Sequence, residues 1–496
     1  MIHEAHGLLT AYDPAAGIVA RNPLYDKDLN NIAPRLSFAW DVTGKGKTVV
    51  RSGFGVFYDD FSQDALTGQI YENSFNAGVA YNPTSASPVQ ILKPASGFPV
   101  LAPDTPVFIR DVTSDVSTVP KNMRTPYVYN YNLNVQQELF RNAVLQVGYV
   151  GSAGRKLLRL RDLNEPTQSQ ITAADLACNC INDGFLRQFS NLANMSSLEP
   201  FQPFYVNQLE ASATSSYNSM QASFTQQNFH GLTQQIAYTW AHSIDTASDS
   251  QDFVPNASMP QNSNNVAGDK GPSNYDVRNR FVWSSTYDLP KWGSHERIGA
   301  GWSLSGILTL MSGHPFSMNY NFIDDFSGSA EFYDRPDVVG PIHYNPSHPL
   351  QYLDLSSFQV PCTYNASVGD GFADSCIPGT RHYGTLGRNA LIGPHYRNFD
   401  FALSKSTALG ERWRLLLRAD FYNLTNHPNF ANPLAVAFFA DAAPNRSSAA
   451  PTGLDLNTGR SVGFYPITAT SDVGLGNPVL GGGGQRSIQL SLKLLF

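Results

Sequence analysis

Four cysteines are the residues with the most specific chemistry in this sequence. They lie in two local pairs within polar, loop-like segments, Cys178 with Cys180 and Cys362 with Cys376. Either pair could supply zinc thiolates, but no histidine stands at ligand spacing beside it. Disulfides formed in an oxidising compartment are therefore favoured. Cys362–Cys376 is the stronger candidate, because a ring as short as Cys178–Cys180 is strained.

An acidic cluster within residues 324–337 is the second candidate for chemistry. Carboxylate oxygens are the ligands that Ca²⁺ prefers, so a weak calcium site is one interpretation. A solvated acidic loop is the other, and it is favoured. The calcium candidates are Asp324, Asp325 and Glu331, with Asp334 and Asp337 close by. No other metal site is predicted.

The sequence lacks the motifs of common enzymes. It has no G-x-S-x-G elbow, no H-E-x-x-H pair and no P-loop, so neither catalytic residues nor a cofactor is predicted. Lys and Arg total 33 against 40 Asp and Glu, which gives a net charge of -7. That balance offers no basic surface for nucleic acid. His314 and His427 each precede a proline, and a turn role is favoured over a metal role.

Five arginines recur on the polar side of alternating segments. They can line a path for an anionic ligand, or they can pair with acidic neighbours such as Asp41, Asp400 and Asp420. The second interpretation is favoured, because a wide sheet needs such cross-strand pairs whatever its function. The candidate lumen-lining residues are Arg35, Arg51, Arg280, Arg414 and Arg418.

Apolar and polar residues alternate with a period of two in the segments that carry these arginines. This pattern predicts strands with two different faces. The last ten residues carry the pattern in full, with a terminal phenylalanine that is typical of strands recognised by the outer-membrane barrel-assembly machinery. The predicted assembly signal is Ile488, Leu490, Leu492, Leu494 and Phe496. Eleven such strands are predicted: 33–42, 48–58, 127–137, 143–151, 217–226, 232–241, 279–289, 302–311, 397–405, 412–422 and 485–496.

The connections between these strands alternate strictly between short and long. The short ones are 43–47, 138–142, 227–231, 290–301 and 406–411, and the long ones are 59–126, 152–216, 242–278, 312–396 and 423–484. Outer-membrane barrels sort their loops in this way, with short periplasmic turns and long extracellular loops. A soluble β-sandwich or propeller is the alternative, but it has no reason to do so. The prediction is an all-β, transmembrane, antiparallel outer-membrane β-barrel.

The composition agrees with a barrel. The 496 residues are 42% hydrophobic, 12% aromatic and only 15% charged. The mean hydropathy is -0.25, and no stretch approaches the roughly 18 apolar residues of a spanning helix. Each strand averages a lipid face with a lumen face, which explains a middling hydropathy. The predicted location is the bacterial outer membrane, with its lipid as a partner.

Motifs spread along the chain resemble the Oar-like TonB-dependent transporters, which carry a carboxypeptidase-regulatory-like N-terminal domain. The resemblance implies a 22-stranded barrel filled by a plug, a ligand bound on the extracellular side, and energy from the TonB complex for moving a bulky substrate. The matching segments are 30–41, 46–59, 147–152, 217–221, 238–245, 275–281, 312–316 and 418–430.

The sequence departs from this family plan, since no signal peptide, regulatory domain, TonB box or plug is recognised in it. About eleven strands equal half of a 22-stranded barrel. We therefore expect residues 1–32 to be a partial extracellular loop and 33–496 an incomplete, C-terminal half of the barrel domain, from a fragment or a split barrel. The TonB complex would act only through a plug missing from this chain.

Two alternatives remain open at this stage. A smaller closed barrel is possible if further strands lie within 59–126. A surface-exposed structural or adhesive barrel without active transport is the alternative function.

Overall fold

The computed structural model describes residues 10–13, 17–20, 25–59, 116–178, 206–248, 259–319, 326–329, 334–365, 367, 375–433, 452–454, 458–467, 470 and 484–496.

All eleven segments with two-faced alternation are neighbouring strands of one antiparallel sheet, in the order β22-β19-β18-β12-β11-β9-β8-β7-β6-β4-β3. The prediction of these strands is confirmed. Their bounds are β3 Arg35–Asp41, β4 Thr48–Tyr58, β6 Tyr127–Phe140, β7 Ala143–Asp162, β8 Val206–Phe229, β9 Leu232–Asp245, β11 Asn279–Asp288, β12 Trp302–Met311, β18 Tyr396–Ala408, β19 Arg414–Tyr422 and β22 Ser487–Leu495.

Short turns join these strands in pairs at one end of the sheet. The β8–β9 turn is His230-Gly231, and both residues have positive φ, 52° and 86°. Positive φ at both positions matches the twist of a two-residue hairpin. In the β3–β4 turn, Asp41 accepts hydrogen bonds from the amides of Gly46 (2.7 Å) and Thr43 (3.2 Å).

Strands β7 and β8 are longer than the alternation predicts. Their register shifts between Gly154 and Leu157, and pairing then continues to Asp162. Beyond the shift, Leu209 packs with Val119 and Met123 in a small buried cluster. The sequence did not predict this extension, because a bulge interrupts the period-two pattern.

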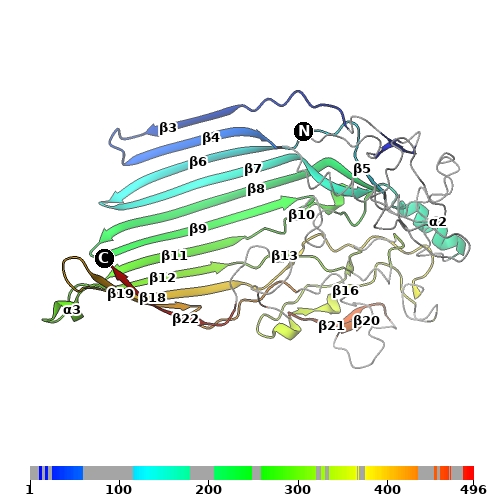
Figure 1. The fold of residues 1–496 in the computed structure, drawn as a ribbon. Helices are drawn as coiled ribbons and strands as arrows, with labels where there is room; N and C mark the ends of the chain where they lie inside the picture. The colour runs from blue at the N-terminus through cyan, green and yellow to red at the C-terminus, as the bar shows by residue number, and fades with distance from the viewer. Residues whose placement is uncertain are drawn as a thin grey trace, which may run out of the picture.

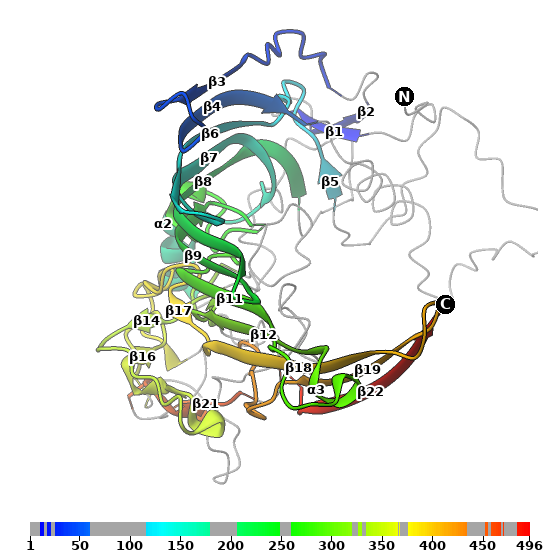
Figure 2. The same cartoon turned by 90° about the vertical axis from the view of Figure 1, so that its left-hand side faces the viewer.

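The sheet curves but does not close. Figure 2 shows an open arc with β3 and β22 at its two ends, and no pairing joins these strands within the described residues. Figure 1 shows the C-terminus and α3, Glu296–Gly299, at one end of the strands, and α2, Gln168–Cys178, with several small sheets at the other. A curved sheet with its short connections at one end and its long connections at the other is expected for a barrel wall.

The described parts of the long connections and of the N-terminal segment form a layer at that second end. One of its buried clusters includes Phe316, Leu353, Phe358 and Leu391. Its elements are β1 Thr10–Asp13, β2 Gly17–Ala20, β5 Val116–Thr118, β10 Gly271–Pro272, β13 Pro315–Phe316, β14 Asp337–Val338, β15 Leu353–Asp354, β16 Phe358–Gln359, β17 Leu391–Ile392, β20 Thr452–Leu454, β21 Ser461–Tyr465, α2 Gln168–Cys178 and the 3₁₀ turns 266–269, 349–351 and 355–357.

Two sequence-based questions fall partly in this layer. Residues 60–115, where closing strands were considered, lie outside the described residues. The described part of that connection holds β5, which pairs with β8 in parallel. Within residues 1–32, β1 and β2 form a hairpin that contacts β5. Among the helices of the described residues, none is long and apolar enough to cross a membrane.

Candidate functional site

The register of the sheet places the five candidate arginines on one face, which we call the polar face. Arg51 pairs with Ala39 and Asn134, and the same row continues through Gly148, Gln221 and Thr239 to Arg280. At the other end of the sheet, Arg418 pairs with Ser404 and Ser491 on this face. Period-two alternation adds Arg35 and Arg414. The register thus agrees with the alternation seen in the sequence, and a role in lining a lumen stays a prediction.

The contacts of these arginines are mostly not ion pairs. Arg418 donates from Nε to Asp420 Oδ1 at 2.8 Å, which is the pairing that the sequence favoured. Arg51 instead donates to Gln136 Oε1 at 2.6 Å, and the Arg35 guanidinium lies 4.5 Å from the centre of the Phe57 ring.

The aspartates that were expected to pair with these arginines mostly bind other groups, and only Asp420 pairs with one of the five. Asp41 binds the amides of its own turn, and Asp400 accepts from the Asn423 amide at 2.8 Å. Within the described part of the chain, no ion pair is formed by Arg35, Arg51, Arg280 or Arg414. Within the described residues, the pairing with acidic neighbours that the sequence favoured is therefore not seen for these four arginines, and pairing with a plug stays a prediction.

The opposite face, which we call the apolar face, carries exposed large hydrophobic side chains along the whole sheet. Register pairs Leu492 with Leu417 and Leu494 with Leu415 on this face. The five residues of the predicted assembly signal are all exposed, at 58% for Ile488, 77% for Leu490, 67% for Leu492, 46% for Leu494 and 94% for Phe496. In a barrel the lipid covers such a face.

A fully buried ion pair holds two distant connections together in the folded layer. Arg381 donates from Nε to Asp175 Oδ1 of α2 at 3.2 Å, and both side chains are fully buried. The other oxygen of Asp175 accepts from the Gly379 amide at 2.6 Å, and Arg381 also donates to the carbonyl of Phe326. Removing either partner would leave an uncompensated buried charge, so both residues are needed where these segments meet.

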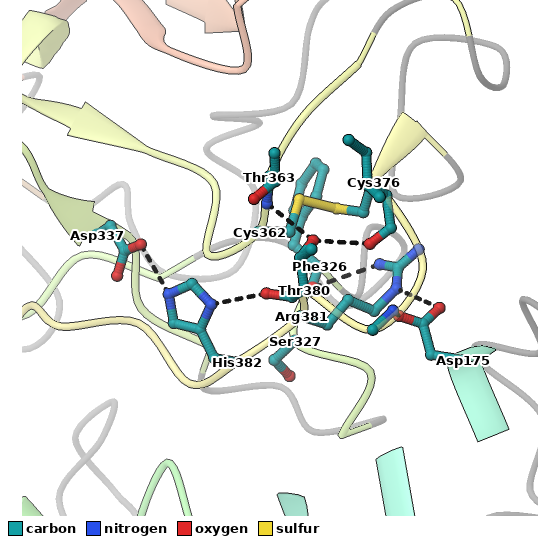
Figure 3. The surroundings of a disulfide bond; sticks show 12 residues. Asp175, Phe326, Ser327, Asp337, Cys362, Thr363, Cys376, Thr380, Arg381 and His382 are labelled. Atoms are coloured by element: carbon teal, nitrogen blue, oxygen red, sulfur yellow. Dashed lines mark hydrogen bonds and ion pairs between the residues drawn. A yellow bond between two sulfur atoms is a disulfide. The ribbon is translucent and has the colours of Figure 1, made fainter. Parts of the chain in front are cut away.

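The Cys362–Cys376 disulfide lies beside this pair (Figure 3). Both cysteines pack against Phe326 and Val360 in a small hydrophobic cluster. The bond that the sequence favoured is therefore present. Cys180 lies outside the described residues, so Cys178–Cys180 stays a prediction.

Arg388 ties the outer end of the sheet to the layer. It forms an ion pair with Asp245, the last residue of β9, and donates from Nε to the Asp269 carbonyl at 2.8 Å. Asp269 in turn binds Arg335 through its carboxylate at 2.6 Å. All four side chains are buried. Buried ion pairs and hydrogen bonds therefore attach the layer to the end of β9.

Glu165 is a buried carboxyl with an altered proton affinity. It follows β7 and accepts hydrogen bonds from Tyr383 Oη (2.6 Å) and from the Ser263 amide (2.5 Å). Burial raises the pKa of Glu165 to about 7, although these two hydrogen bonds oppose the rise. The carboxyl therefore titrates near neutral pH while it joins three connections.

The acidic cluster differs from the favoured solvated loop in its described part. Asp334 is buried and accepts from Ser327 and Ser329. Asp337 is buried too and forms an ion pair of 2.9 Å with His382. The calcium candidates Asp324, Asp325 and Glu331 lie outside the described residues, so calcium binding stays a prediction. The described residues contain no group of three His, Cys, Asp or Glu that could hold a metal.

Sequence reasoning did not identify the ionic residues that organise the layer. Asp245 lies in a segment that carries the family resemblance, but nothing in the sequence indicated its partner or the partners of Arg335 and Asp337. Asp175 and Arg381 are 206 residues apart, which leaves no local spacing to detect.

Taken together, the curved antiparallel sheet, its apolar outer face and its sorted connections define a wall of an outer-membrane β-barrel. The sequence matches the family described as the outer membrane beta barrel domain over residues 2–463. The chain belongs to this family, and its location is the bacterial outer membrane.

Solved structures with a similar arrangement include two bacterial outer-membrane proteins. The outer membrane transporter YddB from Escherichia coli is 10% identical with a TM-score of 0.43, and the match covers 94% of this chain and 40% of YddB. The ferric enterobactin receptor PfeA from Pseudomonas aeruginosa is 10% identical with a TM-score of 0.38, with 98% and 41% covered. This chain therefore spans well under half the length of either protein. No curated protein matches the sequence.

Proposed function

We propose that this chain forms the barrel part of an Oar-like TonB-dependent transporter, which moves a bulky substrate across the outer membrane. The observation that carries the proposal is the open sheet, whose main path has eleven strands and whose two edge strands have no partner within the described residues. The motifs at residues 30–41, 238–245 and 418–430 add the resemblance to that family.

The directions of the edge strands favour a larger barrel. Along an antiparallel path of eleven strands, β3 and β22 run the same way. Joining them directly would create a parallel pair, whereas single-chain bacterial barrels have an even number of antiparallel strands. An unpaired backbone group in lipid costs several kcal/mol, so both edges need partners. Eleven more strands would give the 22-stranded barrel whose lumen holds a plug.

In this proposal the polar face lines the lumen, and the layer of connections forms the extracellular mouth. Arg51, Arg280 and Arg414 then face the path of the substrate, or the plug that fills it. The plug and the TonB complex that would act on it are expected from the family resemblance alone.

An uptake experiment with the full reading frame tests this function. Cells that carry or lack the gene are given fluorescently labelled polysaccharides and polypeptides of increasing size, with and without a protonophore. The proposal expects depletion of one class from the medium that requires both the gene and the proton gradient. Loss of the TonB protein should abolish it as well. Gene-dependent uptake that survives the protonophore would contradict energy coupling.

A second candidate is a surface-exposed structural or adhesive barrel. The buried ion pairs of Arg381 and Arg388 and the disulfide favour it, because they give the extracellular end a fixed shape. Attachment of cells to surfaces that depends on the gene but not on the proton gradient, without any uptake, would support this alternative.

A further inference from the structure

The connection between β11 and β12 differs from the other turns at the same end of the sheet. It runs from 289 to 301 and contains the short helix α3, Glu296–Gly299. The other turns at this end are 42–47, 141–142, 230–231 and 409–413, and none of them contains a helix. Figure 1 shows α3 projecting at the end where the C-terminus lies. In an outer-membrane barrel this end faces the periplasm.

The turn folds back against the apolar face of the sheet. Trp302 alternates with Leu304, which pairs with Tyr287, so its side chain belongs to the apolar face. The Trp302 indole Nε1 donates to the carbonyl of Ile298 at 2.7 Å. α3 also contacts β18 on the far side of β12. The helix therefore lies beside the wall that lipid covers, not across the lumen.

Close backbone contacts hold the turn in this shape. The Trp292 amide donates to the Gly299 carbonyl at 3.0 Å. A Cβ at Gly299 would lie 1.7 Å from the Trp292 carbonyl oxygen, so only glycine permits this approach. Lys405 adds a further contact, since its ammonium lies 5.7 Å from the Trp302 ring centre and donates to the Ala300 carbonyl. These contacts therefore give the turn a defined shape.

The outer surface of the turn is amphipathic. Trp292 is 56% exposed and Ile298 is 60% exposed, although both are large apolar side chains. Lys291 and Arg297 are exposed beside them, and Lys291 donates to Glu296 at 2.7 Å. Apolar residues bordered by basic ones are typical of segments that lie in the headgroup region of a bilayer. Anionic lipid attracts such basic groups.

We propose that residues 289–301 are an interfacial anchor that inserts Trp292 and Ile298 into the periplasmic leaflet, with Lys291 and Arg297 at lipid phosphates. The occupant is lipid because the turn continues the apolar face through Trp302, and that face is already covered by acyl chains in the membrane. This inference depends on the barrel fold and not on transport.

Photo-crosslinking in the native membrane tests the anchor. Benzoylphenylalanine replaces Ile298 in the full reading frame, and the same probe at Lys45, in the polar β3–β4 turn, is the matched control. After irradiation of intact outer membranes, mass spectrometry should find phospholipid on position 298 and none on position 45. A probe at Trp292 repeats the measurement at a second site.

Three outcomes would overturn the proposal. The first is a crosslinked dimer at position 298, which would indicate that a second copy of the chain covers the turn. The second is an adduct with a periplasmic protein, and the third is the absence of any adduct from a folded barrel. Heat-modifiable migration reports that the barrel is folded in each sample. Gly299→Ala should remove the lipid adduct from position 298 while this migration persists. An adduct that survives Gly299→Ala would show that the turn geometry does not place the residue.

Discussion

Gly313 shows how a single missing side chain permits the two ends of the β12–β18 connection to meet. A Cβ at this position would lie 1.8 Å from the carbonyl oxygen of Gly393, whose amide donates to the His314 carbonyl at 2.8 Å. The obstacle is backbone, so it cannot rotate away. The resemblance segment 312–316 thus contains a glycine that the packing of β13 on β17 requires.

We predict that Gly313→Ala lowers the local stability of the β13–β17 pair by about 1–3 kcal/mol, the usual cost of overpacking. Hydrogen exchange at Phe316 and Leu391 measures this free energy of opening. Gly410→Ala is the control, because nothing lies within 4 Å of its Cβ position. Equal exchange in the two variants would contradict the steric argument.

Glu165 gives a pH dependence with a definite sign. Burial raises its folded pKa to about 7, above the unfolded value of about 4.3. The folded layer therefore holds a proton that the unfolded chain releases between these values. Its stability should fall as the pH rises from about 4.3 through 7.

We predict that Glu165→Gln removes this fall, so that the variant layer is more stable than the natural one at pH 8 and similar at pH 4. Limited proteolysis of the layer across this range is the measurement. Glu411→Gln, at an exposed position in a turn, is the control and should keep the natural pH profile. A Glu165→Gln profile that overlays the natural one would rule out this carboxyl as the cause.

At the scale of elements, the strands were predictable and the layer was not. β4 and β12 have the predicted bounds because alternation is local and each residue reports its own face. The layer depends on contacts such as Glu165 with Tyr383, 218 residues apart, and on a bulge in β7 that breaks the alternation. Such contacts leave no periodic signal in a sequence.

The disulfide should stabilise the layer without affecting the sheet. Cys362 and Cys376 close a loop with a sequence separation of 14, for which removal of the bond costs about 3 kcal/mol. We predict that replacing both cysteines with serine speeds hydrogen exchange around Val360 and leaves β11 and β12 unchanged. Faster exchange in those strands too would show that the layer and the sheet unfold together.

The last strand allows assembly to be separated from stability. Phe496 is 94% exposed, and its ring lies 5.6 Å from that of Trp413. Its loss therefore removes little packing within the chain. We predict that Phe496→Ala lowers the amount of heat-modifiable protein in the outer membrane, with little change in the stability of what assembles. Leu495→Ala, on the polar face, is the control; the same loss in both variants would argue against a signal carried by the alternating face.

At the scale of the whole molecule, the two edge strands of the sheet determine whether this chain can form a barrel by itself. The sequence indicated an incomplete barrel from the count of its strands, and the structure places β3 and β22 at the ends of an open arc. If further strands complete the wall, these two edges are never neighbours in the membrane. If the chain closes on itself, they must be.

Cysteine pairs on the polar face distinguish these two cases. Paired strands bring Cα atoms to about 4.5–5.5 Å, within the range of a disulfide. We predict that Ser37→Cys forms no disulfide with cysteine at 489, 491 or 493 in oxidised outer membranes. Ser303→Cys with Ser404→Cys, which are register partners across β12 and β18, should crosslink under the same conditions. Three test positions allow for a shift in register, so a crosslink at any of them would establish closure by β3 and β22 and overturn the larger barrel.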